Sequence, residues 1–151
     1  MKIMFICTGN ICRSAMAEGL LRKRAEDENI SIEVCSAGTY AYTGDYASDS
    51  AIKVMKDYGV DLSGHRATNV SDAKLDDIDV ILCATQKHKQ TLMFLYPDLK
   101  QKMYTMKEYA GTAQNMMDFD IEDPWGKDYK TYKKCAIQIS ECIEGIIDRI
   151  S

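Results

Sequence analysis

The feature that most constrains the fold lies near the start of the chain, where residues 7–14 read Cys-Thr-Gly-Asn-Ile-Cys-Arg-Ser. The apolar run from Ile3 to Ile6 precedes this segment, and a helix-like pattern from Ser14 to about Glu26 follows it. A buried strand that turns through one glycine into a helix directs backbone N–H groups and the positive helix end at one point. The sequence therefore predicts a loop that binds an anion, in particular a phosphate.

The side chains of this loop suit covalent phosphoryl chemistry. Cys7 is the candidate nucleophile, because its thiolate is a reactive anion that the helix end and Arg13 both favour. The planar guanidinium of Arg13 can bind two phosphoryl oxygens at once. Gly9 allows close backbone approach, and Asn10 tolerates a left-handed turn conformation. Ser14 has two possible roles, capping the helix or donating to the Cys7 sulfur. The alternative for Cys7 itself is an ordinary buried thiol.

A reaction through a phosphocysteine also requires an acid that protonates the departing oxygen. We expect Asp123 in this role, because an Asp-Pro step after a long loop presents its carboxyl group in a fixed position. The same step is common in plain turns. Asp118, Asp120 and Glu122 are competitors for the role.

Bulk composition restricts the classes of partner and compartment. The chain has 151 residues and a net charge of −4, so we expect one domain over residues 1–151 and no nucleic-acid partner. No apolar run approaches the roughly 20 residues of a membrane helix, and the apolar start is too short for a signal-peptide core. The six cysteines lack the short paired spacing of zinc sites, and without a secretory signal we expect reduced thiols and a cytoplasmic location.

Strand-like and helix-like segments alternate along the chain, which predicts an α/β domain with a parallel sheet and helices on both faces. Cys7, the loop 36–46 and the turn after Cys83 then lie at the carboxyl ends of strands, where ligands of such folds bind. An apolar stripe between residues 130 and 150 predicts a helix packed on the sheet. The expected strands are residues 2–6, 31–36, 80–83 and 102–106, and the expected helices are residues 14–26, 47–58, 87–95 and 130–150.

With the loop 7–14 and Asp123-Pro124-Trp125 both in view, the chain resembles the low-molecular-weight protein tyrosine phosphatases. The match extends to Met16-Ala17-Glu18, Ser36-Ala37-Gly38-Thr39 and Ser63-Gly64-His65-Arg66-Ala67. The resemblance implies a single three-layer domain with a four-stranded parallel sheet and no metal or organic cofactor. It also implies a phosphorylated protein as substrate and inorganic phosphate as product.

The same resemblance assigns roles to individual residues. Cys7 is the expected nucleophile, Arg13 the phosphate ligand and Asp123 the general acid and base. Ser36 and His65 are expected to brace the loop, as are Asn10 and Ser14. Tyr42 and Trp125 would wall a slot for a phenyl ring. The expected contacts to the phosphate and substrate are Thr8, Gly9, Asn10, Ile11, Cys12, Ser14, Tyr42 and Trp125.

Cys12 matches a second loop cysteine of the family that can pair with the nucleophile. A reversible Cys7–Cys12 disulfide that protects Cys7 from over-oxidation is therefore one hypothesis. The alternative is that Cys12 only packs in the protein interior.

Three other functions fit the same scaffold. Thioredoxin-coupled arsenate reductases have a similar first loop, and Cys83 stands where they keep a relay cysteine, but their next relay position is Gln90 here. Residues 85–90 and 106–109 resemble the corresponding segments of protein arginine phosphatases. Those enzymes, however, have Thr at the loop position where this chain has Ile11. The methyl groups of Ile11 suit an aromatic substrate, which favours phosphotyrosine. A phosphopeptide-binding module would use Arg13 but would have no need of Cys7 and Asp123.

Overall fold

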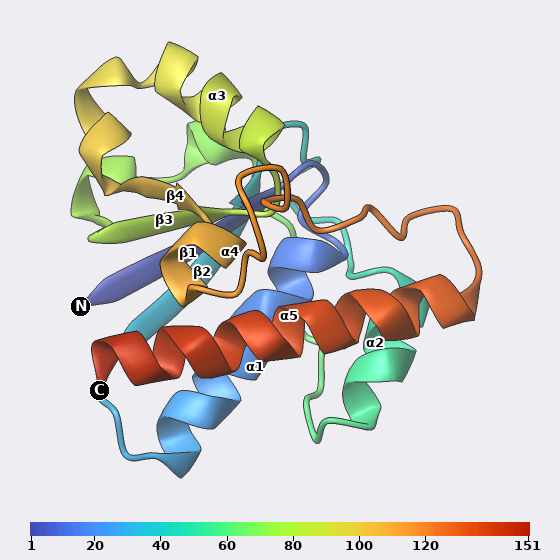
Figure 1. Ribbon diagram of the computed structural model, residues 1–151. Helices are drawn as coiled ribbons and strands as arrows, with labels where there is room; N and C mark the ends of the chain where they lie inside the picture. Colours follow the sequence, from blue (N-terminus) through green and yellow to red (C-terminus); the bar gives the residue numbers. More distant parts are fainter.

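A computed structural model describes residues 1–151, and a four-stranded parallel sheet forms its centre (Figure 1). The strands are β1 (Lys2–Cys7), β2 (Glu33–Gly38), β3 (Val80–Cys83) and β4 (Met103–Thr105), in the order β2-β1-β3-β4. All three neighbouring pairs are parallel. Apart from its first residue, β1 is buried throughout, because a central parallel strand is covered on both faces.

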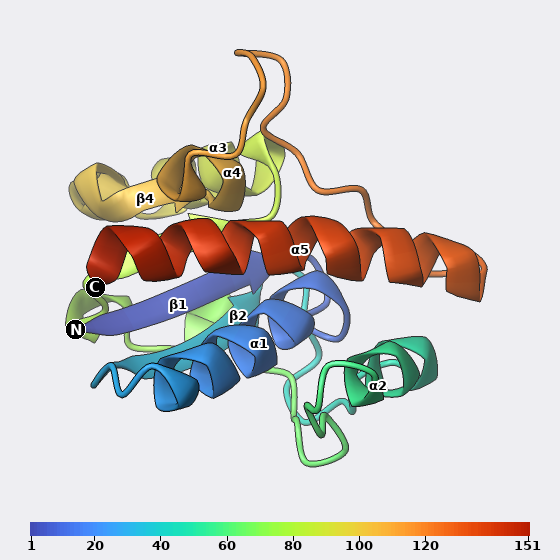
Figure 2. The same ribbon diagram turned by 60° about the horizontal axis from the view of Figure 1, so that its bottom comes forward.

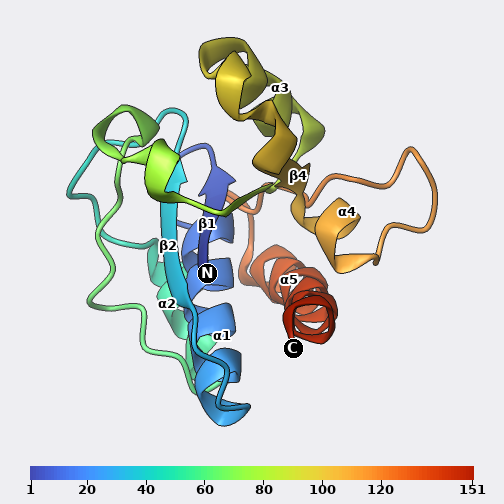
Figure 3. The same cartoon turned by 90° about the vertical axis from the view of Figure 1, so that its left-hand side faces the viewer.

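Helices cover both faces of the sheet, as the sequence predicts. On one face lie α1 (Arg13–Asp27) and α5 (Tyr129–Ile150), with α2 (Asp49–Lys56) beside α5 (Figure 2). On the other face lie α3 (Gln86–Leu95) and three short 3₁₀ segments, so that the sheet separates two hydrophobic clusters (Figure 3). The three-layer α/β fold is confirmed. None of the helices is both long enough and apolar enough to span a membrane.

Several boundaries differ from the predicted ones by a few residues, and one helix was not predicted. The strand predicted over residues 31–36 is Glu33–Gly38, and the helix predicted over residues 47–58 begins after its N-cap residue Ser48. The strand predicted over residues 102–106 ends early, because the Thr105 hydroxyl and the Glu108 carboxylate form a capping box. This box starts the unpredicted helix α4 (Met106–Ala110).

The apolar stripe of α5 packs as predicted. Its inward residues are buried against α1, α4 and the sheet, and only the last one, Ile150, is partly exposed. Gly145 lies directly against the carbonyl of Ala110, where any β-carbon would clash. This contact brings α4 and α5 together. The buried stripe residues are Tyr132, Ala136, Ile139, Ile143 and Ile146.

The order of the strands places the site. β1 pairs with β2 on one side and with β3 on the other. The chain therefore runs from β1 to β2 in one direction along the sheet, and then from β2 past β1 to β3 in the opposite direction. A crevice for ligands forms at the carboxyl end of such a central strand. Cys7 is the last residue of β1 and therefore lies at this crevice.

Candidate active site

The loop from Cys7 to Arg13 joins β1 to α1 and has the predicted left-handed turn. Asn10 adopts a φ of 56°, and Cys7 is only 2% exposed at the base of the loop. The Ser14 hydroxyl oxygen lies 2.9 Å from the Cys7 sulfur. Ser14 is already inside α1, and the N-cap residue Cys12 makes no side-chain capping bond. Of the two roles considered for Ser14, the structure therefore supports the contact with Cys7.

Asn10 holds the loop together through both ends of its side chain. Its amide nitrogen donates to Ser14 Oγ (2.7 Å) and to Ser36 Oγ (2.9 Å), and its amide oxygen accepts from the backbone N–H of Thr68 (2.9 Å). His65 Nε2 donates to the Asn10 carbonyl at 2.7 Å. Because Asn10 donates to Ser14, the Ser14 hydroxyl hydrogen is free to donate to the sulfur. Ser36 and His65 thus both contact Asn10 of the loop, as the family resemblance implies for bracing residues.

Arg13 is 4% exposed and connects the loop to the segment before α5. Its Nη1 donates to the carbonyl of Ile121 at 2.9 Å, and its Nη2 lies 3.6 Å from Oδ2 of Asp123. Its Nε is buried without any hydrogen-bond partner. A buried N–H without a partner is rare and costly in folded proteins. The guanidinium therefore keeps donor capacity for an anion that enters the loop.

The four carboxylates that competed for the role of general acid lie in different surroundings. Asp118 accepts from Lys107 at 2.7 Å, which lowers the pKa of Asp118. Asp120 accepts from the backbone N–H of Gln86 at 2.8 Å, at the start of α3.

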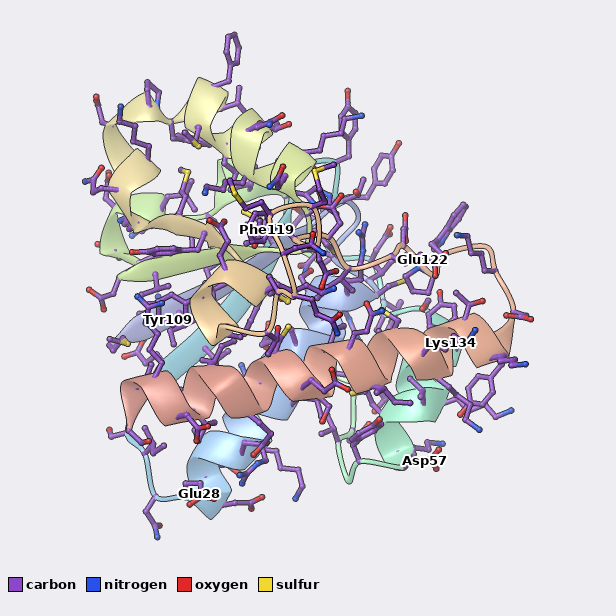
Figure 4. The ribbon with its side chains drawn as sticks, in the orientation of Figure 1. Glu28, Asp57, Tyr109, Phe119, Glu122 and Lys134 are labelled. Atoms are coloured by element: carbon purple, nitrogen blue, oxygen red, sulfur yellow. The ribbon has the colours of Figure 1, made fainter.

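Glu122 pairs with Lys127 at 3.1 Å and lies with Phe119 on the segment that leads to α5 (Figure 4). Asp123 is the only one of these four that contacts Arg13. The geometry therefore favours Asp123 as the acid.

A cavity of about 310 Å³ opens above the loop. Ile11 forms part of its wall, and the mostly exposed rings of Tyr40, Tyr42 and Trp125 surround it. Tyr42 and Trp125, which the family resemblance implies as walls, both line this cavity, and Tyr40 is a third aromatic residue there that was not singled out. The residues that line the cavity are Thr8, Gly9, Ile11, Cys12, Arg13, Tyr40, Tyr42, Asp45, Asp123 and Trp125.

The side chain of Cys12 belongs to a buried polar cluster. Its sulfur lies 3.2 Å from the Tyr132 hydroxyl and 3.4 Å from that of Ser48, and these two hydroxyl oxygens are 3.1 Å apart. Burial raises the pKa of the Cys12 thiol. The apolar stripe of α5 predicted that Tyr132 is buried, but it contained no sign of this polar contact.

His88 is a residue of the site that sequence reasoning missed. Its Nε2 lies 2.8 Å from Thr8 Oγ1, and its Nδ1 lies 2.8 Å from Thr85 Oγ1. Burial, and secondly the positive charge of Arg13, lower the pKa of His88 to about 4. Thr85 is the N-cap of α3, and this capping pattern was the available sequence signal. No group of three or more His, Cys, Asp or Glu side chains is placed to hold a metal ion.

Comparisons with known proteins agree with this architecture. The family model described as low molecular weight phosphotyrosine protein phosphatase matches residues 2–151. EpsP of Ralstonia nicotianae, a probable low molecular weight protein-tyrosine-phosphatase, is 32% identical over 98% of this chain and 94% of its own length.

Two solved structures share the fold. A low molecular weight protein tyrosine phosphatase from T. tengcongensis is 37% identical, with a TM-score of 0.91 over 99% of both chains. The YwlE arginine phosphatase, solved as a mutant with a phosphorylated active-site serine, is 29% identical, with a TM-score of 0.91 over 99% of this chain and 95% of that one. The chain therefore belongs to the family of low molecular weight phosphotyrosine protein phosphatases.

Proposed function

We propose that the protein hydrolyses phosphotyrosine in phosphorylated proteins through a phosphocysteine on Cys7. The observation that carries the proposal is the convergence of three groups on one loop. The Cys7 sulfur with its Ser14 donor, the unpartnered buried Nε of Arg13, and the Asp123 carboxylate all lie at the carboxyl end of β1. Family membership supports this assignment of roles.

The first step transfers the phosphoryl group to the enzyme. The Cys7 thiolate attacks phosphorus, an S–P bond forms, and the P–O bond to the tyrosine breaks. Arg13 and the loop amides hold the phosphoryl oxygens in the transition state. Asp123, carrying a proton, protonates the tyrosine oxygen as it departs.

The second step hydrolyses the phosphocysteine. The Asp123 carboxylate accepts a proton from the attacking water, the new P–O bond forms, and the S–P bond breaks. The sulfur leaves as a thiolate, which the Ser14 hydroxyl stabilises by donating to it from 2.9 Å. Inorganic phosphate is the product. No metal or organic cofactor is required in either step.

The walls of the cavity support an aromatic substrate. Ile11, Tyr40, Tyr42 and Trp125 present apolar or aromatic surface above the loop, which matches the flat apolar faces of a phenyl ring. The relatives include an arginine phosphatase as well as tyrosine phosphatases. Phosphoarginine is therefore the second candidate substrate. Replacement of Ile11→Thr should shift the ratio of the two rates towards phosphoarginine, and an unchanged ratio would remove this argument for phosphotyrosine.

The buried position of Cys83 argues against an arsenate reductase. Cys83 is completely buried at the end of β3, among the side chains of the second hydrophobic cluster. Burial raises the pKa of this thiol far above its ordinary range. A relay cysteine has to be reached by other thiols and has to ionise. The complete burial of Cys83 opposes both.

The decisive experiment compares turnover of phosphotyrosine, phosphoarginine and arsenate by the wild type and by Cys7→Ser. We expect phosphotyrosine to be the best substrate, its turnover to be lost in the variant, and vanadate binding to be retained. A burst of phenol from an aryl phosphate should precede steady-state turnover. A phosphopeptide-binding module would give neither burst nor turnover, and that result would overturn the proposal. We place this activity in the cytoplasm, where the buried thiols would stay reduced.

A further inference from the structure

The Thr85–His88–Thr8 chain of side chains connects the start of α3 to the phosphate loop. His88 is buried, and each of its ring nitrogens lies 2.8 Å from a threonine hydroxyl oxygen. Thr8 is exposed and lines the cavity above Cys7. The chain therefore runs from the protein interior to the place where a phosphoryl group would bind.

The hydrogen bonds around Thr85 favour one direction for this chain. Thr85 Oγ1 accepts the backbone N–H of His88 as the N-cap of α3, at 3.2 Å, and its own hydrogen can then be donated to Nδ1 of His88. A ring that accepts at Nδ1 must donate from Nε2 when it is neutral, so His88 donates to Thr8 Oγ1. In the reverse direction Thr85 Oγ1 would accept from both His88 Nδ1 and the His88 backbone N–H, and its own hydrogen would bond to neither of these two partners.

A neutral ring is what the surroundings of His88 favour. Burial and the charges of Arg13 and Lys87 lower the pKa of His88 to about 4, against the opposing charges of Asp120 and Asp123. At neutral pH His88 therefore carries one ring hydrogen, and the Thr85 contact favours its position on Nε2. The Thr8 hydroxyl oxygen then accepts a hydrogen bond from His88 Nε2, and the Thr8 hydroxyl hydrogen can be donated to a group in the cavity.

We propose that His88 is a positioning residue that turns the Thr8 hydroxyl into a one-way donor to an oxygen of the bound phosphoryl group. Thr8 contacts the anion, and His88 acts only through Thr8. This inference rests on the proposed function for its catalytic consequence, but the binding of an oxyanion tests it without any turnover.

The experiment compares Thr8→Val, His88→Leu and the double variant, using the dissociation constants of orthovanadate and inorganic phosphate as readout. Thr8→Val should weaken binding about tenfold or more, the value of one hydrogen bond to a charged group, and His88→Leu by a smaller factor, because the Thr8 hydroxyl remains. The double variant should be no weaker than Thr8→Val, because both changes remove the same interaction. His88→Gln, whose amide can still donate to Thr8, should recover much of the affinity. Additive losses, or no loss in either single variant, would overturn the proposal.

Two further measurements separate positioning from a general loss of structure. Leu92→Ala removes a buried side chain of α3 that packs in the second hydrophobic cluster, which contains no residue of the phosphate loop. It should lower stability without changing vanadate affinity.

Nitrogen-15 spectra of the two histidines of the chain should show the hydrogen on Nε2 in both. His65 serves as the internal reference, since its Nε2 faces a carbonyl that can only accept. A hydrogen on Nδ1 of His88 would overturn the proposal. A wild type that binds vanadate but hydrolyses no phosphate ester would instead overturn the proposed function alone.

Discussion

The hydroxyl oxygen of Ser14 lies 2.9 Å from the sulfur of Cys7, and the Asn10 amide donates to the same oxygen from 2.7 Å. The Asn10 bond orients the hydroxyl, so that its hydrogen faces the sulfur. Ser14 therefore stabilises the sulfur anion both before it attacks phosphorus and after it leaves.

Ser14→Ala should slow the hydrolysis of the phosphocysteine more than its formation. A hydrogen bond to a charged group contributes about 1.5–3 kcal/mol, which corresponds to a loss of kcat of roughly tenfold or more. In stopped-flow measurements with p-nitrophenyl phosphate, the variant should release p-nitrophenol in a more distinct burst than the wild type, followed by a slower steady state. Ser36→Ala is the matched control, because Ser36 accepts from the same amide but does not contact the sulfur. Equal effects of the two changes would contradict this role.

Asp123→Asn should distinguish substrates by their leaving groups. An acid contributes most where the departing oxygen is a poor leaving group, so phenyl phosphate turnover should fall by about 10²-fold or more, and dinitrophenyl phosphate turnover by much less. Glu122→Gln is the control from the same segment, since Glu122 pairs with Lys127 instead of Arg13. A larger loss in Glu122→Gln would move the role of acid to Glu122.

Replacement of Asn10 should separate the contribution of its side chain from that of its backbone conformation. Asn10→Ala removes three side-chain hydrogen bonds and places an alanine at a φ of 56°. We expect a loss of about 2–4 kcal/mol in the free energy of unfolding, measured in urea. Asn10→Gly should lose less by about 1 kcal/mol, because glycine adopts this conformation without strain. Equal losses would show that the backbone is not strained there.

Protonation of His88 should destabilise the folded protein in acid. The unfolded chain binds this proton near the ordinary pKa of 6.5, whereas in the folded protein burial lowers the pKa of His88 to about 4. Because the unfolded state binds more protons between these values, stability falls as the pH is lowered through this window.

Relative to His88→Gln, the wild type should lose about 2–3 kcal/mol between pH 7.5 and 4.5. The comparison is made by urea unfolding of both proteins at each pH. Parallel stability curves would show that the His88 ring is not titrated in this range.

Tyr132→Phe should make Cys12 more available for oxidation. Peroxide converts the Cys7 thiolate to a sulfenic acid with release of hydroxide, and the Cys12 thiol then condenses with the sulfenic acid to form a Cys7–Cys12 disulfide and water. In the structure the Cys12 sulfur is held by Tyr132 and Ser48, and these contacts have to break first. We expect faster disulfide formation in the variant, measured by mass spectrometry of peroxide-treated protein. No disulfide in either protein, with no recovery of activity after thiol treatment, would remove the protective role of Cys12.

The sequence was most informative where one short segment carried both a fold signal and a chemical signal. The pattern around Cys7 predicted a strand, a turn and a helix together with a phosphate loop, and the left-handed Asn10 confirmed the turn. The sequence named Asp123 as the expected acid but could not exclude three other carboxylates within the same six residues. What separates Asp123 from these competitors is its contact with Arg13 across the fold, and no local pattern encodes this contact. His88 was missed for the same reason, since its partner Thr8 is 80 residues away.

The short helix α4 is a different case. Its capping box was present in the sequence, but the strand-like residues before it extended the predicted strand through Met106. The capping box formed by Thr105 and Glu108 starts the helix there, and these two residues alone were enough to predict it.

The bond from Arg13 Nη1 to the carbonyl of Ile121 has a consequence for any kinetic study of this site. The same guanidinium that faces the loop also anchors the chain two residues before Asp123. Any substitution of Arg13 therefore alters the distance between the Cys7 sulfur and the Asp123 carboxylate. The rate lost in an Arg13 variant is the product of two effects and cannot be read as the value of one contact with phosphate.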